Sequence, residues 1–427
     1  MPRIRTVATS MIGLAIVAVT TSSPVGAMPE PAALAFTAPM QLDTVAGVPW
    51  NVTVADIDQD GHADIVTADA LQAGWGGVSV LRNQGGAAAF DRPVQAATGP
   101  FTTAAAVADL NADSRPDIVA ANSGDLAEGG VSVVVNHTAD RSGHVEFGQP
   151  QKFAAGLSPG QLAIADVDGD AKPDLVVGNL LNVVLGAVDV LINTTEPGSD
   201  RITFGPPHPF AAGFVAEGLA VADLDQDGRT DIVVGETGSS TVSVLMNRTP
   251  GPGATPLFET VRMLSILPNG VGPVDVNNDG RLDLLTSVAP GTPLAGVLVS
   301  IDDATTGPPE FRPIGPGTGS AGTGFVPESL ATADFDDDGR IDVVTAAAVS
   351  IEGLPGGLAV ARNLTAPHAP DARFAPPLLL PAGTGTNAVA VGDLDNDDRP
   401  DLVTANSGSL NGHHAVSVLR NRTGLPG

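Results

Sequence analysis

The chain has 427 residues, of which 43% are hydrophobic and 16% are charged, and this composition supports a large folded core and excludes a disordered protein. The absence of Cys excludes disulfide bonds and a Cys-linked lipid anchor, so packing and bound metal remain as sources of stability. The formal net charge of −28 gives a surface that repels nucleic acid and anionic lipid. We therefore expect no nucleic-acid partner.

The first 27 residues have the pattern of an export signal. Arg3 and Arg5 precede an apolar run from Met11 to Val19, and small residues lead to Ala27. The run is about half of the roughly 20 residues that span a bilayer, and no later apolar segment is long enough. We expect residues 1–27 to be a signal peptide and residues 28–427 to be a secreted, extracellular protein without membrane insertion. The Ala-, Gly- and Arg-rich, Lys-poor composition is typical of bacteria.

Seven Asp-rich stretches of nine residues recur along the chain, each beginning and ending with Asp. Their starts lie 53, 57, 57, 52, 59 and 59 residues apart, which is enough for four short strands and their turns in each unit. We number the loops and their units one to seven: residues 56–64, 109–117, 166–174, 223–231, 275–283, 334–342 and 393–401.

Each Asp-rich loop lies between two strand patterns. In unit one, VTVA from Val52 to Ala55 has its larger apolar residues at alternate positions, with small residues between them, and DIVTA follows from Asp64. The small residues indicate that the other face of the first strand meets a close neighbour. A third strand pattern runs from Val78 to Asn83, and a Phe marks the fourth. The seven marker residues are Phe36, Phe90, Phe147, Phe204, Phe258, Phe311 and Phe374.

The order of these pieces predicts the architecture. The first Phe strand, Leu34 to Leu42, precedes loop one, whereas the last unit stops after its third strand near Asn421. Seven four-stranded units result only if the N-terminal strand joins the last unit. The sequence therefore predicts an all-β fold: a seven-bladed β-propeller of four-stranded blades, with the ring closed by the N-terminal strand joining the last blade. We expect a monomer.

The repeated loops resemble FG-GAP and VCBS repeats, the units of the integrin α-subunit propeller and of many secreted bacterial proteins. The resemblance covers nearly the whole mature chain. It implies that each loop joins the innermost strand of a blade to the next strand and binds one calcium ion on one face of the ring, while ligands usually meet the other face. Unit five departs most, with Gly272 to Val276 as its inner strand and Asp302 to Ala304 after its third, so we expect an irregular blade.

The side chains of the loops suit calcium, which prefers six to eight oxygen ligands at about 2.3 to 2.6 Å. Alternate residues of a tight loop can direct their carboxylates at one centre. In loop one the expected ligands are the side chains of Asp56, Asp58, Asp60 and Asp64 and the backbone carbonyl of His62. The alternative is a metal-free Asx turn, which seven copies make less favourable because so many carboxylates repel one another.

The other six loops repeat this ligand pattern, with Arg contributing its backbone carbonyl only. The expected ligands are Asp109, Asn111, Asp113, Asp117, Asp166, Asp168, Asp170, Asp174, Asp223, Asp225, Asp227, Arg229, Asp231, Asp275, Asn277, Asp279, Arg281, Asp283, Asp334, Asp336, Asp338, Arg340, Asp342, Asp393, Asp395, Asp397, Arg399 and Asp401.

The seven loops are not equal as calcium sites. Loops one, four and six have four Asp ligands and a turn Gly such as Gly61, which tolerates positive φ, so they should bind best. Loop five substitutes Asn277, and loop seven has Asp398 at the turn. Loops two and three, with Ser114 and Ala171 at the turn, are the least favourable. We expect up to seven Ca²⁺ ions, with affinities of roughly 0.1 to 1 mM.

A basic residue follows the turn position in every loop. We interpret these side chains as screens for the Asp cluster, because calcium does not take cationic ligands; a binding stripe on that face is the alternative. They are His62, Arg115, Lys172, Arg229, Arg281, Arg340 and Arg399.

Six Asn residues lie in NxT sequons, which in a secreted protein can indicate glycosylation. Five of them close the third strand, so we interpret the Asn and Thr as residues that turn the chain there. The six are Asn51, Asn136, Asn193, Asn247, Asn363 and Asn421.

No group of acids, bases or nucleophiles stands out as a catalytic centre. We expect a non-enzymatic module that binds a protein or polysaccharide on the face opposite the calcium loops. One alternative is a calcium-dependent lectin that uses Trp50 or Trp75. Another is a polysaccharide lyase or hydrolase, which the absence of Tyr and the scarcity of Lys oppose. His413 and His414 lie in a glycine-containing loop and are expected to be solvated.

Glu217 and Glu328 occupy equivalent positions before their inner strands, on the side opposite calcium. They could surround a central ligand, although two polar residues at a channel mouth are common without a function. The equivalent positions in the other units do not define a site by residue type: Trp50, Thr103, Gly160, Asn269 and Asn387.

Overall fold

The structure is a computed structural model that describes residues 33–45, 47–70, 76–85, 90–124, 129–139, 143–181, 188–265, 268–288, 296–302, 309, 311–313, 320–322, 328–347, 356–410 and 413–424. The expected signal peptide and Trp75 lie outside the described residues. None of the described residues is helical, so this part of the chain has no helix long and apolar enough to cross a bilayer. The prediction of an all-β fold is confirmed.

The described strands pair antiparallel in seven sheets, one for each repeat unit. The innermost strands are β2(Val48–Ala55), β6(Thr102–Ala108), β10(Pro159–Ala165), β14(Ala216–Ala222), β18(Pro268–Val274), β23(Ser329–Ala333) and β27(Thr386–Gly392). The second strands are β3(Asp64–Ala70), β7(Asp117–Asn122), β11(Asp174–Asn179), β15(Asp231–Glu236), β19(Asp283–Val288), β24(Asp342–Ala347) and β28(Asp401–Leu410).

The outer half of each sheet contains the third and outermost strands. The third strands are β4(Gly77–Leu81), β8(Gly130–Val134), β12(Val188–Leu191), β16(Thr241–Asn247), β20(Gly296–Asp302), β25(Gly357–Ala361) and β29(His413–Leu419). The outermost strands are β5(Val94–Ala96), β9(Gln151–Phe153), β13(His208–Phe210), β17(Phe258–Ser265), β21(Phe311–Pro313), β26(Leu378–Pro381) and β1(Met40–Asp43). In unit five β22(Ser320–Gly322) also pairs with β20, so its outer strand is split, which confirms the predicted irregularity.

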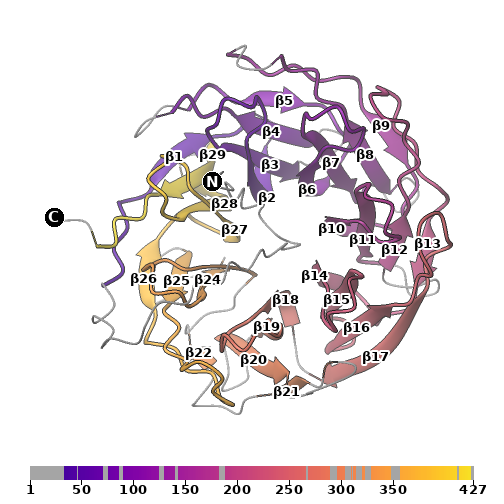
Figure 1. The fold of residues 1–427 in the computed structure, drawn as a ribbon. Coiled ribbons are helices and arrows are strands. Elements are labelled where there is room, and N and C mark those ends of the chain that lie inside the picture. The colour runs from indigo at the N-terminus through magenta and orange to yellow at the C-terminus, as the bar shows by residue number, and fades with distance from the viewer. Residues whose placement is uncertain are drawn as a thin grey trace, which may run out of the picture.

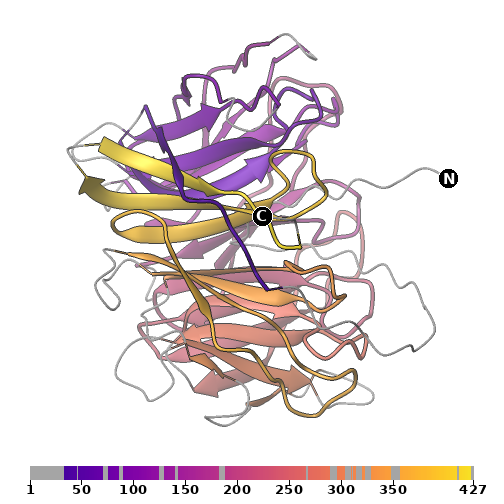
Figure 2. The same cartoon turned by 90° about the vertical axis from the view of Figure 1, so that its left-hand side faces the viewer.

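The sheets lie around a common centre (Figure 1), and each innermost strand contacts the innermost strand of the next sheet. β27 of the last sheet likewise contacts β2 of the first. The N-terminal strand β1 pairs with β29, from Met40 opposite Val418 to Asp43 opposite Ala415, and Figure 2 shows this indigo strand beside the yellow C-terminal strands. The two ends of the chain therefore share one sheet.

The sequence predicted that each Phe lies within an outermost strand, and in most units this prediction is wrong. In five units the Phe forms an isolated bridge to the Asn that follows the third strand, for example Phe204 with Asn193, and the outermost strand begins later. Pro follows each of these Phe residues within three positions and has no N–H for the ladder. After Phe258 no Pro interrupts the chain, and β17 runs unbroken from Phe258 to Ser265.

The hydrophobic core lies between successive sheets. One cluster joins units two and three, another joins units seven and one, and both consist of Val, Leu, Ile and Ala side chains from facing strands. The inner strands approach closely, as the small residues predicted: a Cβ atom on Gly392 would lie 2.7 Å from Cγ1 of Val54. Burying this apolar surface stabilises the fold by roughly 25 cal/mol per Å².

The Asn residues that follow the third strands tie neighbouring sheets together. The Asn136 side chain is fully buried, and its Nδ2 donates hydrogen bonds to the carbonyl oxygens of Pro116 (3.0 Å) and Ile57 (2.9 Å), the latter in the preceding Asp-rich loop. Its Oδ1 accepts a hydrogen bond from the Thr138 amide. Equivalent bonds to the preceding loop come from Asn83, Asn193, Asn247, Asn363 and Asn421. The interpretation of the sequon Asn as turn-forming is confirmed, since these buried side chains leave no space for a glycan.

Candidate metal centre

Every Asp-rich loop joins an innermost strand to the second strand of the same sheet. The first Asp of the loop follows the inner strand, and the last Asp is the first residue of the second strand, as with Asp56 and Asp64. Because the inner strands run in the same sense around the centre, the seven loops lie at the same end of the molecule. We number the nine loop positions from the first Asp.

The first and last Asp residues fold the loop by accepting backbone hydrogen bonds. Asp56 accepts from the amides of Asp60 (3.1 Å) and Gly61 (2.9 Å). Asp64 accepts from the amides of Ile57 (2.9 Å) and Asn83 (2.7 Å), so it joins the loop to the end of the third strand. These carboxylates therefore cap backbone amides in the manner of an Asx turn.

The turn residue at position six is left-handed in all seven loops, as predicted. Gly61 has φ of 91° and Asp398 has φ of 63°. Ser114 (φ 70°) and Ala171 (φ 67°) are held in the same conformation without being Gly, which costs backbone energy. Position four is also left-handed in every loop, although its mixed residue types did not indicate this. The residues are Gln59, Ala112, Gly169, Gln226, Asn278, Asp337 and Asn396.

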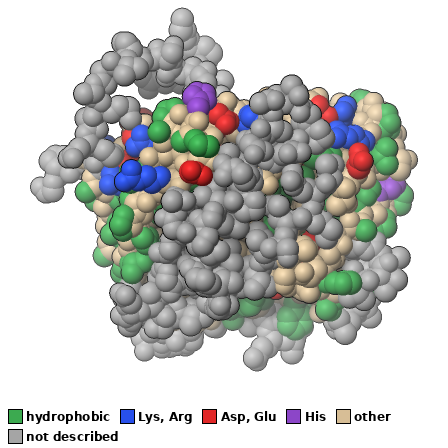
Figure 3. Space-filling view, turned by 90° about the horizontal axis from the view of Figure 1, so that it is seen from below, with side chains coloured by type: hydrophobic (Ala, Val, Ile, Leu, Met, Phe, Trp, Pro, Cys, Tyr) green, Lys and Arg blue, Asp and Glu red, His purple; other side chains and the backbone are tan. Residues whose placement is uncertain are grey.

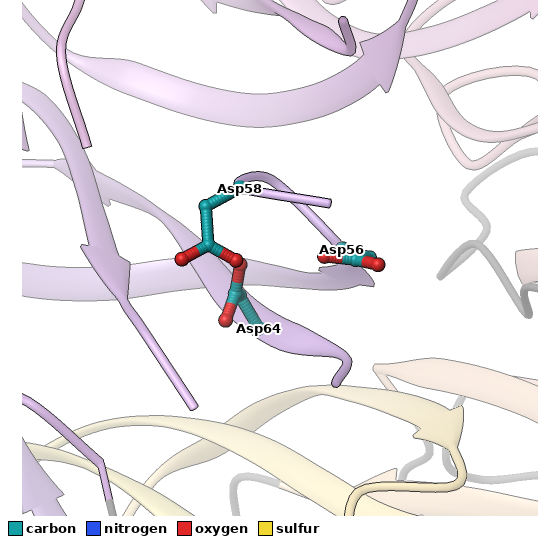
Figure 4. A group of neighbouring side chains, drawn as sticks. All are labelled: Asp56, Asp58 and Asp64. Atoms are coloured by element: carbon teal, nitrogen blue, oxygen red, sulfur yellow. The ribbon is translucent and has the colours of Figure 1, made fainter. Parts of the chain in front are cut away.

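Carboxylates at positions one, three and nine converge in five loops. In each triad one oxygen from every residue lies within 4.8 Å of the others. Figure 4 shows the triad of loop one, with the carboxylates of Asp58 and Asp64 directed toward one another. The five triads are Asp56, Asp58 and Asp64; Asp166, Asp168 and Asp174; Asp223, Asp225 and Asp231; Asp334, Asp336 and Asp342; and Asp393, Asp395 and Asp401.

The position-three carboxylates provide a test of whether a cation fits. In loops one, four, six and seven the Oδ1 atom of this residue is buried and has no hydrogen-bond partner among the described residues: Asp58, Asp225, Asp336 and Asp395. An anionic oxygen without a partner is costly to bury. A divalent cation coordinated by the triad would satisfy it, and the all-oxygen donor set suits calcium.

Burial raises the pKa of the position-nine carboxyls. The pKa of Asp231 is raised to about 7, against the lowering effect of hydrogen bonds from the Asn247 and Leu224 amides, and the neighbouring Asp225 raises it further. Burial likewise raises the pKa values of Asp174 and Asp342 to about 7. These groups therefore hold their negative charge weakly unless a cation compensates for it.

In five loops the position-five carboxylate pairs with the basic residue at position seven, whereas in loop one Asp60 pairs with Arg82. In loop four, Arg229 Nη2 lies 2.5 Å from Oδ2 of Asp227. The interpretation of these basic side chains as screens is confirmed in loops two, three, four, six and seven. The further pairs are Arg115 with Asp113, Lys172 with Asp170, Arg340 with Asp338 and Arg399 with Asp397. Figure 3, an edge-on view, shows charged side chains gathered along one rim.

A second set of arginines, beside the third-strand Asn residues, was not predicted from the sequence. These arginines contact the position-three carboxylates of the four loops that have an unpartnered oxygen: Arg82, Arg248, Arg362 and Arg422. Arg420 instead lies inside unit seven, only 4% exposed, and its Nη1 donates to Oδ2 of Asp401 at 2.8 Å. The triad of loop seven therefore contacts two arginines, Arg420 and Arg422, whereas those of loops one, four and six each contact one among the described ion pairs.

Position three is occupied differently in the remaining loops. Asn111 accepts from the Asp113 amide (3.2 Å) and donates to the Ser199 carbonyl (3.1 Å). Asn277 forms the equivalent bonds in loop five. In loop three both Asp168 oxygens accept backbone hydrogen bonds, one of them from Gly253 at 2.7 Å. These oxygens are already satisfied by the protein.

The weaker sequence candidates are placed as follows. Trp50 lies in β2 and is 51% exposed. His413 and His414 begin β29, in a strand rather than the expected loop, and their side chains are outside the described residues. Glu217, in β14, and Glu328, directly before β23, lie at the ends of the inner strands that are opposite the Asp-rich loops.

Comparison with known proteins identifies the repeats. Residues 109–177, 223–286 and 334–404 match the family described as FG-GAP-like repeat. No curated protein matches the chain. Among solved structures, one similar chain is in the "Crystal structure of BBS1N in complex with ARL6DN, soaked with mercury"; it is 12% identical, with a TM-score of 0.49 over 90% of this chain and 96% of that one. The chain therefore contains three FG-GAP-like repeats, as the Asp-rich loops predicted, and its described residues form an all-β fold of antiparallel sheets that is consistent with a β-propeller.

Proposed function

We propose that the protein is a secreted β-propeller whose Asp-rich loops bind calcium and whose opposite face binds a partner without catalysing a reaction. The observation that carries the calcium proposal is the buried, unpartnered Oδ1 of the position-three Asp, found in loops one, four, six and seven beside two further carboxylates. A hard divalent cation would satisfy three anionic oxygens at once. It would also offset part of the net charge of −28.

The loops differ as candidates. Loops one, four and six combine a complete triad, an unpartnered oxygen and a turn Gly, so we infer that they bind calcium most tightly. Loop seven has the triad but also the Arg420 guanidinium. Loops two, three and five use their position-three side chains in protein hydrogen bonds, so calcium would have to replace contacts that already exist.

The proposed scaffold is a ring of seven blades closed by the N-terminal strand. Three observations support it: a sheet for each of the seven units, the pairing of β1 with β29, and the contact of β27 with β2. The export pattern of residues 1–27 supports secretion. Outside the cell, calcium at about 1 mM would load sites of the affinity typical of extracellular modules.

We place the partner, a protein or a polysaccharide, on the face opposite the Asp-rich loops. The described part of that face includes the beginnings of the inner strands. Trp50 is exposed there and offers an apolar platform for a sugar ring, and this single residue supports the lectin alternative. Neither alternative requires catalysis.

The experiment that tests the calcium proposal counts ions and measures thermal unfolding of the mature protein before and after chelation. We expect at least four bound calcium ions, one for each unpartnered oxygen, and a lower melting temperature after chelation. Asp225→Ala should remove one ion, whereas Asp200→Ala, at a side chain that is 76% exposed outside the loops, should remove none. A protein without calcium whose melting temperature ignores the chelator would contradict the proposal.

A further inference from the structure

The inner strands surround a cavity of about 350 Å³ at the end of the molecule opposite the Asp-rich loops. The seven equivalent positions that the sequence could not define as a site all line it: Trp50, Thr103, Gly160, Glu217, Asn269, Glu328 and Asn387. One residue therefore comes from each unit. The repeat geometry places these positions together although their residue types differ.

The charge of the cavity is one-sided. Glu217 and Glu328 line it from units four and six, with Asn269 of unit five between them, and no Lys, Arg or His is among the described lining residues. Burial raises the pKa values of both carboxyls, and repulsion from Glu217 raises that of Glu328 further, so the two are close enough to interact. Glu217 also accepts a hydrogen bond from the Thr237 side chain, which holds it in place.

The cavity also contains polar atoms without a protein partner. Gln161 Oε1 and Asn387 Nδ2 are buried and unpartnered among the described residues. Thr103 Oγ1, in contrast, donates to the Pro159 carbonyl at 2.9 Å and serves the fold. A ligand group that accepts from Asn387 and donates to Gln161 would remove the cost of burying these atoms.

The remaining walls indicate the size and kind of ligand. Leu180, Leu219 and Leu330 contribute apolar surface, and Trp50, which is 51% exposed, adds an aromatic ring. The volume is about ten times the roughly 30 Å³ that one water molecule occupies, so a bare metal ion would leave most of the cavity to solvent. Two carboxylates and an indole favour an ammonium group on a short carbon chain.

We propose that this cavity binds a small organic cation of the diamine class, with its ammonium groups held by Glu217 and Glu328 and its carbon chain against the leucines and Trp50. This site is separate from the Asp-rich loops. It extends the proposed binding function by naming a ligand chemistry, and its failure would leave the calcium count unchanged.

The test is isothermal titration of the calcium-saturated mature protein with 1,4-diaminobutane, and with 1,4-butanediol as the uncharged control. We expect one diamine per chain and no binding of the diol. Glu217→Gln and Glu328→Gln should each weaken diamine binding at least about tenfold, because each removes one charge-assisted contact. Trp50→Ala should weaken it about threefold or more.

Glu259→Gln is the matched control, since its side chain is 69% exposed on the outermost strand β17, and it should leave diamine binding unchanged. Counting calcium in each variant separates this site from the loops: all four variants should keep the wild-type number. Absence of diamine binding, equal binding by both Gln variants and the wild type, or displacement of the diamine by excess calcium would each overturn the proposal.

Discussion

The side-chain amide of Asn193 donates a hydrogen bond to the backbone carbonyl of Leu110, 2.9 Å away, and thereby joins the third strand of unit three to the Asp-rich loop of unit two. The same amide reaches the Pro173 carbonyl of its own loop (3.1 Å), and the Asn193 backbone amide donates to Asp174 (2.8 Å). One buried residue thus connects two candidate calcium loops. The arrangement couples the conformation of each loop to that of its neighbour.

Replacing this residue should destabilise the protein strongly. Asn193→Ala leaves two buried carbonyls and the Thr195 amide without their partner, and each lost partner costs about 1 to 3 kcal/mol. We expect the free energy of unfolding to fall by about 3 kcal/mol or more, measured by denaturant titration in calcium. Thr194→Ala is the control, because it removes only an exposed hydrogen bond to Thr203. Equal effects of the two substitutions would contradict this role for Asn193.

The sequence predicted the fold because the features that define it are local. Alternation of apolar and small residues marks the inner strand, and Asp-x-Asp-x-Asp marks the loop. Phe36 precedes loop one and no Phe follows Asn421, which indicates that the N-terminal strand supplies the outer strand of the last unit. The pairing of β1 with β29 follows from the phase of the repeat, since the first unit begins one strand early. Only the boundaries moved, where Pro after Phe delays the outermost strand.

The details of the site were less predictable because they depend on tertiary register. Nothing in the sequence near Asp225 indicates that Arg248, 23 residues later, will contact its carboxylate. The cavity shows the same limit. Glu217, Asn269 and Asn387 converge only because the units close around a centre, and the sequence reveals their equivalence without their distance.

Without calcium, the protein should become more stable, not less, as the pH falls from neutral. In the metal-free protein, burial raises the pKa values of Asp174, Asp231 and Asp342 to about 7, above the ordinary value of 3.8 for an unfolded Asp. A raised folded pKa contributes stability that is present below the unfolded pKa and is lost as pH rises through the folded pKa. We expect the metal-free melting temperature to rise as pH falls from about 7.5 to about 5.

With calcium bound, protons and the ion compete for the same carboxylates, so the trend should disappear or reverse over this range. The measurement is a pair of thermal-unfolding series, one on protein freed of metal by chelation and desalting, the other at saturating calcium. A metal-free protein that loses stability on acidification from neutral pH would show that these carboxyls are not held in a costly charged state.

The turn position of loop three should tolerate Gly better than its present residue. Ala171 has φ of 67°, a conformation that costs a residue with a Cβ about 1 to 2 kcal/mol. Gly avoids this cost but loses more backbone entropy on folding, which offsets about half of the gain. Ala171→Gly should therefore raise the free energy of unfolding by about 0.5 to 1 kcal/mol. The reverse change in loop four, Gly228→Ala, should lower it by a similar amount, since a Cβ there meets no atom within 4 Å and only the backbone responds. Thermal unfolding of both variants in calcium measures the pair, and changes of the same sign would refute the argument.

Loop seven should bind calcium more weakly than loops one, four and six because the Arg420 guanidinium already neutralises the Asp401 carboxylate. The guanidinium is buried, lies 6.0 Å from the centre of the Phe90 ring, and donates to Asp401 while its Nε and Nη2 have no partner among the described residues. Arg420→Met fills a similar volume without the charge, so calcium should no longer be repelled from the triad and its affinity at this loop should rise at least about tenfold, equivalent to about 1.4 kcal/mol. In the absence of calcium the same variant should be less stable than wild type, because Asp401 loses its counter-charge. Lys152→Met, which removes an exposed charge from the outermost strand β9, should change neither quantity.

Calcium titration monitored by ion counting, together with unfolding of the metal-free proteins, distinguishes a competing cation from a merely structural arginine. Only the competing cation predicts both tighter calcium binding and lower metal-free stability in the Arg420→Met variant.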